Sequence, residues 1–226
     1  MLDIGCGIGA ITSGIAVAVG LEGRVVGVDR DAGHLNVARG EYSRLSNLTF
    51  ETGDATSLDY RGEFDIVTAA RTLQWIAQPQ RAIQGMRQAA RAGGVLVVLD
   101  YNHTKNQWEP EPPREFLHFY RAFLAWREAN GWDNEMAEHL PGMFIEAGLT
   151  GVESHPQDEV AERGDADFEG RSAIWGEVID NVGEQVAGAG FCTPAEVALA
   201  RNVYREWACT DLLRQTLTLS AVTGYV

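Results

Sequence analysis

The sequence is poor in positive charge. Lysine occurs once, at position 105, and 18 Lys and Arg residues stand against 32 Asp and Glu residues, which gives a formal net charge of −14 over 226 residues. A surface this acidic repels phosphate backbones and anionic lipid headgroups. We therefore expect no nucleic-acid partner, neither RNA nor DNA, and no binding to a membrane surface.

Cysteine and long apolar runs are also scarce. The three cysteines, Cys6, Cys192 and Cys209, are odd in number and unpatterned, as is typical of a reducing cytoplasm. Neither a C-x-x-C nor an H-E-x-x-H spacing occurs, so no metal site is expected. No apolar run approaches the ~20 residues of a membrane span, and no charged leader with an apolar core opens the chain. These absences predict a cytoplasmic protein, and its length suits one large domain or one domain with a subdomain.

The first hundred residues alternate between short apolar runs and helical patterns. The runs predict strands at 1–4, 24–28, 48–51, 64–69 and 95–99. Helices are predicted at 10–19, at 32–45 with Asp31 as N-cap, and from Pro79 to an end at Gly93-Gly94. Because the strands are apolar without alternation, we expect a parallel sheet that helices cover on both faces.

The second half is more helical. Helices are predicted near 113–130, 133–147 and 167–187, and another begins at the capping box Thr193-Pro194-Ala195-Glu196. The helix at 113–130 carries an unusually aromatic stripe, which is more often core than pocket. Strands are predicted near 149–154 and at 217–226.

The glycine-rich segment at the start carries most of the chemistry. It reads Leu2-Asp3-Ile4-Gly5-Cys6-Gly7-Ile8-Gly9, and the next apolar run ends on Asp29. Glycines let the backbone pass close to a ligand, and the following helix points free N–H groups toward it. A carboxylate at the tip of the second strand can accept hydrogen bonds from a ribose diol. Together these features predict a site for an adenosine-containing cofactor at the carboxyl end of the sheet.

Two cofactors fit this outline. Gly5-x-Gly7-x-x-Ala10 with Asp29 matches the dinucleotide fingerprint, so a nicotinamide dehydrogenase is one hypothesis. S-adenosylmethionine is the other, because it is cationic and has no pyrophosphate, and Asp3 beside the glycine loop suits a cation. Asp54, after the third strand, can accept from the exocyclic amine of adenine.

At this point the chain resembles the class I S-adenosylmethionine-dependent methyltransferases, in particular the small-molecule, type 11-like group. Five motifs stand in the family's order and at its usual spacing: Leu2 to Gly9, Val28-Asp29, Gly53-Asp54-Ala55, Phe64-Asp65-Ile66-Val67 and Gly93-Gly94-Val95-Leu96-Val97-Val98. The resemblance covers residues 1 to about 100 well and the remainder in outline. Leu73-Gln74-Trp75 is closest to the quinone-biosynthesis C-methyltransferases.

The resemblance implies an α/β Rossmann-like doubly wound sheet of order 3-2-1-4-5-7-6, with its last strand antiparallel. Residues 1–100 would form the cofactor-binding core, to which 133–159 and 211–226 add the remaining elements. Residues 101–132 and 160–210 would form a helical cap over the open end of the sheet. The family usually places one or two helices ahead of the first strand. Here the chain begins inside that strand, so we expect a truncated form or a misassigned start.

The resemblance also implies the residues of the cofactor site. They are Asp3, Gly5, Cys6, Gly7, Gly9, Asp29, Arg30, Gly53, Asp54, Ala55, Arg71 and Trp75. Cys6 would fill space between two glycines. Each carboxylate has a simpler reading as well: Asp3 as a brace of the glycine loop, Asp29 as a helix-start residue and Asp54 as a turn-former before Thr56.

Methyl transfer from a sulfonium is an in-line displacement that needs alignment and no acid. A general base is needed only for a hydroxyl or a carbon acid, and His103, after the fifth strand, is the candidate. The simpler interpretation, a loop histidine that hydrogen-bonds a backbone carbonyl, is the favoured one. Trp108 and Tyr120 are candidates for stacking on a flat substrate.

The sequence thus predicts S-adenosylmethionine-dependent methyl transfer to an O, N or C nucleophile of a small molecule. The alternatives are an NAD(P)-dependent oxidoreductase, a cofactor-binding protein without methyl-transfer activity, and a macromolecule methyltransferase. The oxidoreductase is disfavoured because Asp3 and Asp54 have no role in it, and nitrogen methylation of a macromolecule because Ala69-Ala70-Arg71-Thr72 follows the fourth strand. The oligomeric state is left open.

Overall fold

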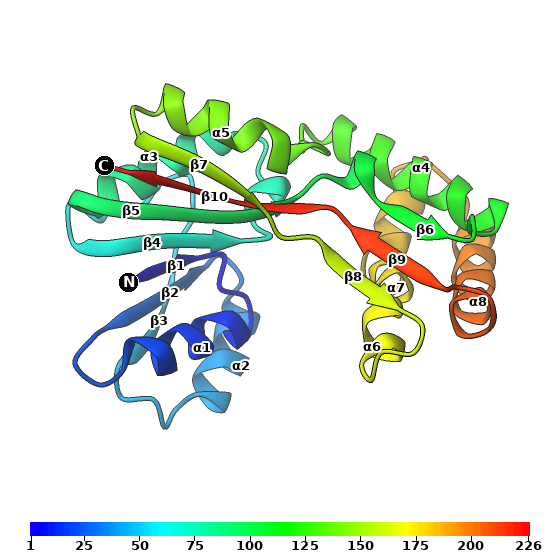
Figure 1. The fold of residues 1–226 in the computed structure, drawn as a ribbon, viewed down its shortest axis with the longest axis horizontal. Helices are drawn as coiled ribbons and strands as arrows, with labels where there is room; N and C mark the ends of the chain where they lie inside the picture. Colours follow the sequence, from blue (N-terminus) through cyan, green and yellow to red (C-terminus); the bar gives the residue numbers. More distant parts are fainter. The chain divides into compact units, whose positions relative to one another are not determined.

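The computed structural model describes residues 1–226 and divides into two compact units. Unit 1 comprises Met1–Asp100, Met136–Pro156 and Ser220–Val226, and unit 2 comprises Tyr101–Glu135 and Gln157–Leu219. Figure 1 shows the elements of both units along the chain. The chain therefore leaves unit 1 twice and returns to it twice.

Unit 1 is a seven-stranded sheet with helices. Its strands are β1 (Leu2–Ile4), β2 (Val25–Asp29), β3 (Leu48–Thr52), β4 (Phe64–Ala70), β5 (Ala90–Tyr101), β7 (Thr150–Pro156) and β10 (Leu219–Tyr225). Its helices are α1 (Ala10–Val19), α2 (Ala32–Glu41), the 3-10 helix η1 (Leu73–Trp75), α3 (Pro79–Ala89) and α5 (Met136–Glu146). The strand order is β3-β2-β1-β4-β5-β10-β7, with β10 antiparallel to β7. This confirms the doubly wound fold and the predicted order, in which β10 takes the place of the seventh strand and β7 that of the sixth.

The register of the parallel strands brings their carboxyl ends to one edge of the sheet. Leu2 pairs with Val26 and with Val67, and Val25 pairs with Leu48, so β1 lies between β2 and β4 and β2 between β1 and β3. The strand cores are fully buried, as Leu2, Val26 and Val67 show with 0% exposure. The segments that follow β1, β2, β3 and β4 therefore meet above one edge of the sheet.

One boundary in this unit differs from the expectation. Gly93 and Gly94 do not end the helix, because α3 ends at Ala89 and both glycines lie within β5. The β4–β5 register shifts between Phe64 and Ile66, which is a bulge in the ladder. Gly93 adopts φ +76°, and a Cβ on Gly94 would lie 2.8 Å from the Arg91 carbonyl oxygen. The two glycines therefore make the bulge possible, because Gly93 tolerates a positive φ and Gly94 leaves room for the neighbouring carbonyl oxygens.

Unit 2 contains a small antiparallel sheet and five helical segments. The sheet has the order β6-β9-β8, from Gln107–Glu109, Arg214–Leu217 and Glu159–Glu162. The helical segments are η2 (His103–Lys105), α4 (Arg114–Ala129), α6 (Phe168–Ser172), α7 (Ile174–Gly188) and α8 (Pro194–Thr210). Residues 214–217, expected with the core, belong to this sheet, and the helix expected over 167–187 is interrupted at Ala173.

Aromatic rings fill the interior of unit 2. The Trp175 ring lies 4.8 Å from that of Tyr120, 5.5 Å from that of Phe123 and 6.0 Å from that of Phe116, as centroid distances. The aromatic stripe of α4 is thus core, because these rings are buried against α7 and α8. Edge-to-face pairs at such distances add to the stabilisation from burial.

The capping box of α8 is present as expected. The Thr193 hydroxyl oxygen accepts from the Glu196 N–H at 3.2 Å, and the Glu196 carboxylate accepts from the Thr193 N–H at 2.7 Å. We expect Thr193→Ala to lower the free energy of unfolding by about 1 kcal/mol, because it removes one partner of this box. Urea denaturation measures the loss. Thr210→Ala, at the other end of α8, is the control and should change stability less; equal losses would contradict the capping role.

Candidate cofactor site

The glycine loop after β1 lies in a conformation that only glycine adopts easily. Gly5, Gly7 and Gly9 have φ values of +69°, +54° and +83°. The N–H groups of Gly5 and Cys6 both donate to the Val28 carbonyl oxygen, at 2.7 and 3.1 Å. This fastens the loop to β2. A Cβ on Gly7 would meet nothing within 4 Å, so this glycine presents an open face.

Asp29, the last residue of β2, holds the loop from the other side. Its Oδ2 accepts from the Gly7 N–H and its Oδ1 from the Asp31 N–H, both at 2.8 Å. Each carboxylate oxygen keeps a further lone pair, so Asp29 can still accept from two hydroxyl groups. Asp31 in turn caps α2, as expected, by accepting from the N–H groups of Gly33 and His34.

Asp54 follows β3 at the same edge of the sheet and is exposed. Its Oδ1 accepts from both the N–H and the hydroxyl of Thr56, at 2.7 Å each. These bonds lower the pKa of Asp54 and keep it ionised. Its second oxygen has no hydrogen bond in the structure. Asp54 therefore forms a turn with Thr56, as its simpler interpretation predicts. Its second oxygen is left for a ligand.

Asp3 is a buried carboxylate inside β1. It is 3% exposed and accepts from the Thr12 hydroxyl at 2.6 Å, rather than from loop N–H groups. Burial raises its pKa to about 6, and the Thr12 hydrogen bond opposes that rise in part. Thr12 was not among the predicted site residues. Its position in the first turn of the helix that follows the glycine loop could have indicated a hydrogen bond to Asp3.

This raised pKa predicts a pH dependence of stability. The folded protein binds the Asp3 proton more tightly than the unfolded chain, whose carboxyl has its ordinary pKa of 3.8. The resulting stabilisation is therefore present below about pH 4 and is lost as the pH rises to about 6. We expect Asp3→Asn, which keeps an oxygen for Thr12, to abolish a decline on the order of 2–3 kcal/mol over this range. Urea denaturation at several pH values measures the difference between the two proteins, and parallel profiles would contradict the assignment.

Cys6 lies between two glycines of the loop and is half-buried. Burial raises the pKa of its thiol to about 12, and the nearby carboxylates of Asp3 and Asp29 act in the same direction. Its thiol is therefore protonated at neutral pH and a poor nucleophile, which agrees with a space-filling role.

The remaining predicted residues of unit 1 also gather at this edge. Gly53 donates its N–H to the Asp29 carbonyl oxygen at 3.0 Å and is followed by Asp54 and Ala55. Arg30 follows β2 and Arg71 follows β4, and both are exposed. Arg71 is the one non-glycine residue with positive φ, at 57°, and its N–H donates to Leu99. Trp75 ends η1, half-buried.

Two residues near the loop were not predicted. The Thr72 side chain approaches Gly5 so closely that a Cβ there would lie 2.3 Å from its Oγ1. Asp100, near the end of β5, is fully buried and accepts from the Gln74 N–H at 3.0 Å. It anchors η1, a role that only the three-dimensional structure reveals.

The predicted catalytic and substrate residues lie in unit 2. His103 is 6% exposed, stacks on Tyr101 with ring centroids 5.2 Å apart, and lies edge-on to Phe123 and Trp175. Burial, with Arg127 adding to it, lowers its pKa well below the ordinary value, so the ring is neutral. The catalytic role of His103 stays a prediction.

Trp108 and Tyr120 belong to the same aromatic interior. The Trp108 indole N–H donates to Gln215 Oε1 at 2.9 Å, and the Tyr120 hydroxyl donates to the His103 carbonyl oxygen. Their rings are in edge-to-face contact, with centroids 5.2 Å apart. Their role as substrate contacts also stays a prediction.

A methyltransferase domain model matches residues 1–139. The chain therefore belongs to the methyltransferase domain family, and the resemblance seen in its motifs is confirmed. It is 29% identical over 171 residues to the demethylmenaquinone methyltransferase of Shouchella clausii, covering 67% of this chain and 70% of that protein. It is 30% identical over 134 residues to the trans-aconitate 2-methyltransferase of Deinococcus radiodurans, covering 58% of this chain and 50% of that one.

Solved structures share the fold. A phosphoethanolamine N-methyltransferase 2 of Haemonchus contortus, in complex with S-adenosylhomocysteine, superposes with a TM-score of 0.62 at 16% identity. The match covers the whole of this chain and 48% of that one. The chain spans between 28% and 70% of the first curated relatives it matches. None of its helices combines the length and apolar character that crossing a membrane requires.

Proposed function

We propose that this protein transfers a methyl group from S-adenosylmethionine to a nucleophilic O, N or C atom of a small molecule. The observation that carries the proposal is the set of carboxylates around the glycine loop: Asp3, Asp29 and Asp54, each at or next to the carboxyl half of a parallel strand. A cationic adenosyl cofactor suits three negative charges, whereas a dinucleotide pyrophosphate is repelled by them. Membership of the methyltransferase domain family supports the same conclusion.

The residues present fit this cofactor. Asp29 would accept from the ribose hydroxyls, since both of its oxygens keep a lone pair, and Asp54 would accept from the adenine amine through its second oxygen. The open face of Gly7 leaves room for a ligand against the backbone. Asp3, with its pKa at about 6, is mostly ionised at neutral pH and would favour the ammonium group. The other predicted contacts, Gly5, Cys6, Gly9, Arg30, Gly53, Ala55, Arg71 and Trp75, are proposed on their position at the same edge.

When bound, S-adenosylmethionine supplies an electrophilic methyl group on a sulfonium. The protein's own task is then to bind the cofactor in one orientation and to exclude water, which is the larger part of catalysis in such displacements. Small-molecule acceptors are the substrates that the names of two curated relatives give for those proteins. The net charge of −14 supports a small acceptor over a nucleic acid.

Calorimetric titration of the purified protein with S-adenosylmethionine, S-adenosylhomocysteine and NADH tests the proposal. We expect micromolar binding of both adenosyl compounds and none of NADH. Binding of NADH alone would establish the oxidoreductase alternative instead. Labelled methyl transfer to a panel of small quinols, carboxylic acids and amines then separates an enzyme from a protein that only binds the cofactor.

A further inference from the structure

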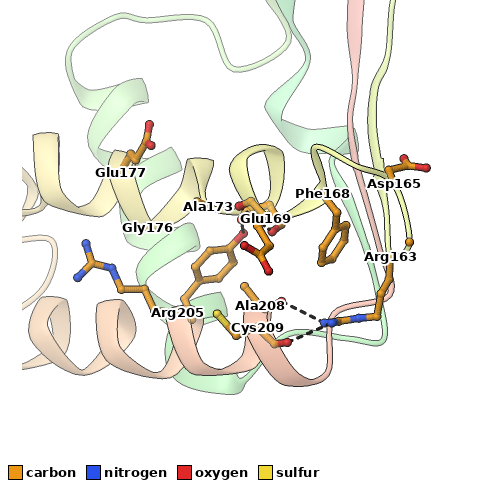
Figure 2. Close-up of a pocket in the computed structure, with 13 residues that line it drawn as sticks. Arg163, Asp165, Phe168, Glu169, Ala173, Gly176, Glu177, Arg205, Ala208 and Cys209 are labelled. Atoms are coloured by element: carbon orange, nitrogen blue, oxygen red, sulfur yellow. Dashed lines mark hydrogen bonds between the residues drawn. The ribbon is translucent and has the colours of Figure 1, made fainter.

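Unit 2 contains a cavity that the proposed chemistry does not use. It has a volume of about 620 Å³ and is lined by the turn after β8 and by α6, α7 and α8, all within unit 2 (Figure 2). Ligand cavities for small organic molecules fall in this range of size.

The walls of the cavity are largely apolar. Phe168 and Ala208 line it, and Gly176 lines it on the α7 side. The ring of the fully buried Tyr204 forms another wall, and its hydroxyl lies 2.7 Å from the Ser172 carbonyl oxygen and 3.0 Å from Gln215 Oε1. Its polar atom is thus satisfied within the protein, and the buried ring supports the apolar wall from behind.

Both positive charges at the cavity are compensated. Arg163 donates to the carbonyl oxygens of Leu212, Cys209 and Ala208, at 2.7, 3.1 and 3.2 Å, and so caps the carboxyl end of α8. Figure 2 shows two of these bonds. Its guanidinium also lies 4.9 Å from the centroid of the Phe168 ring. Arg205 pairs with Asp180, a carboxylate that it shares with Arg201. Figure 2 shows the Arg205 guanidinium pointing away from Glu169.

The negative charges at the cavity are not compensated. Asp165, Glu169 and Glu177 line it, and the structure gives none of the three carboxylates an ion pair. In Figure 2 the Glu169 side chain extends from α6 toward α8, whereas Glu177 points away from α8. An apolar cavity with one carboxylate directed into it, and no arginine paired with that carboxylate, complements a positively charged molecule with an apolar body.

We propose that this cavity binds a small organic cation, an amine or ammonium carried on an apolar body, with its charge facing Glu169. The inference is independent of the proposed methyl transfer, because every residue that it uses lies in unit 2 and outside the glycine loop.

Three probes of one shape and different charge test the proposal: 4-phenylbutylamine, 4-phenylbutanol and 4-phenylbutyrate. Calorimetry on the full chain should rank the amine first, the alcohol second and the carboxylate last. Glu169→Gln should weaken amine binding roughly two- to fivefold, as for a partly exposed ion pair, and leave alcohol binding unchanged. Glu184→Gln, an exposed glutamate on α7 outside the cavity, is the matched control and should change neither.

Filling the cavity locates the site. Ala208→Phe should abolish binding of all three probes, and Ala173→Leu, at an exposed lining position, provides the same test if the first variant does not fold.

The amine should also slow alkylation of Cys209, which is exposed at the cavity, as followed by mass spectrometry of its peptide. Equal binding of amine and carboxylate, binding that survives both filled variants, or no binding of the amine would overturn the proposal. S-adenosylmethionine affinity measured on the same variants reports separately on the methyltransferase function.

Discussion

Asp29→Ala is expected to reduce S-adenosylmethionine affinity by at least roughly 100-fold. The substitution would remove the carboxylate proposed to accept from two ribose hydroxyls, and hydrogen bonds to charged groups contribute about 1.5–3 kcal/mol each. It would also release the Gly7 and Asp31 N–H groups that the carboxylate holds in the structure. Calorimetric titration of wild type and variant measures the change.

Two further variants make this test specific. Asp59→Ala removes an exposed carboxylate elsewhere in unit 1 and should leave affinity unchanged. Asp29→Asn keeps one acceptor oxygen and should fall between wild type and Asp29→Ala. Thermal denaturation without ligand shows whether the loop itself has been lost. An affinity of Asp29→Ala within threefold of wild type, with normal stability, would remove Asp29 from the cofactor site.

Gly5→Ala is expected to lower the free energy of unfolding by about 2–5 kcal/mol. The φ of +69° costs about 1–2 kcal/mol for a residue with a Cβ, and overpacking adds about 1–3 kcal/mol. The crowding is specific, because the new Cβ would lie 2.3 Å from Thr72 Oγ1 and 2.4 Å from its Cγ2. Urea denaturation followed by circular dichroism measures the loss.

Gly7→Ala is the matched control for this substitution. Gly7 has a φ of +54° in the same loop, but an added Cβ would meet nothing within 4 Å. It should therefore show only the backbone cost of about 1–2 kcal/mol. Combining Gly5→Ala with Thr72→Ala should restore part of the lost stability, because the two nearest atoms are removed. Equal losses of unfolding free energy for the two glycine variants would show that the Thr72 side chain moves aside without destabilising the protein.

The sheet was predictable because its strands are continuous apolar runs between helices. Val25–Asp29 is buried on both faces, Phe64–Ala70 is buried over most of its length except at Asp65, and the glycine loop fixes the position of β1 between them. The carboxylates of the candidate site were predictable for a related reason. Asp29 and Asp54 end or follow such strands, and parallel strands bring their carboxyl ends together.

The small sheet of unit 2 could not be predicted in this way. β6 and β8 have three and four residues, and glutamate occurs in both. Runs this short and polar carry no periodicity, so only pairing with the distant β9, as Gln107 with Thr216 and Glu159 with Leu217, defines them. The cavity beside α8 is beyond prediction for the same reason, since its walls come from separate helices and a turn. Burial of Arg127, whose Nε donates to Asn134 Oδ1 at 2.8 Å, likewise depends on a partner seven residues away.

The chain leaves β7 after Pro156 and re-enters the sheet at Ser220, and these two residues are register partners in the β7–β10 ladder. Residues 157–219 therefore form a long excursion whose two ends are held side by side, in the manner of a hairpin loop. Loop-closure entropy grows only with the logarithm of length, by about 0.6 kcal/mol for each doubling. The ladder thus tolerates large insertions and deletions in this excursion with little change in its own free energy. Insertions in the turns of this excursion therefore leave the strands that carry the glycine loop undisturbed, whereas β9 and α8 have to be kept, because β9 pairs with β6 and α8 packs against α4.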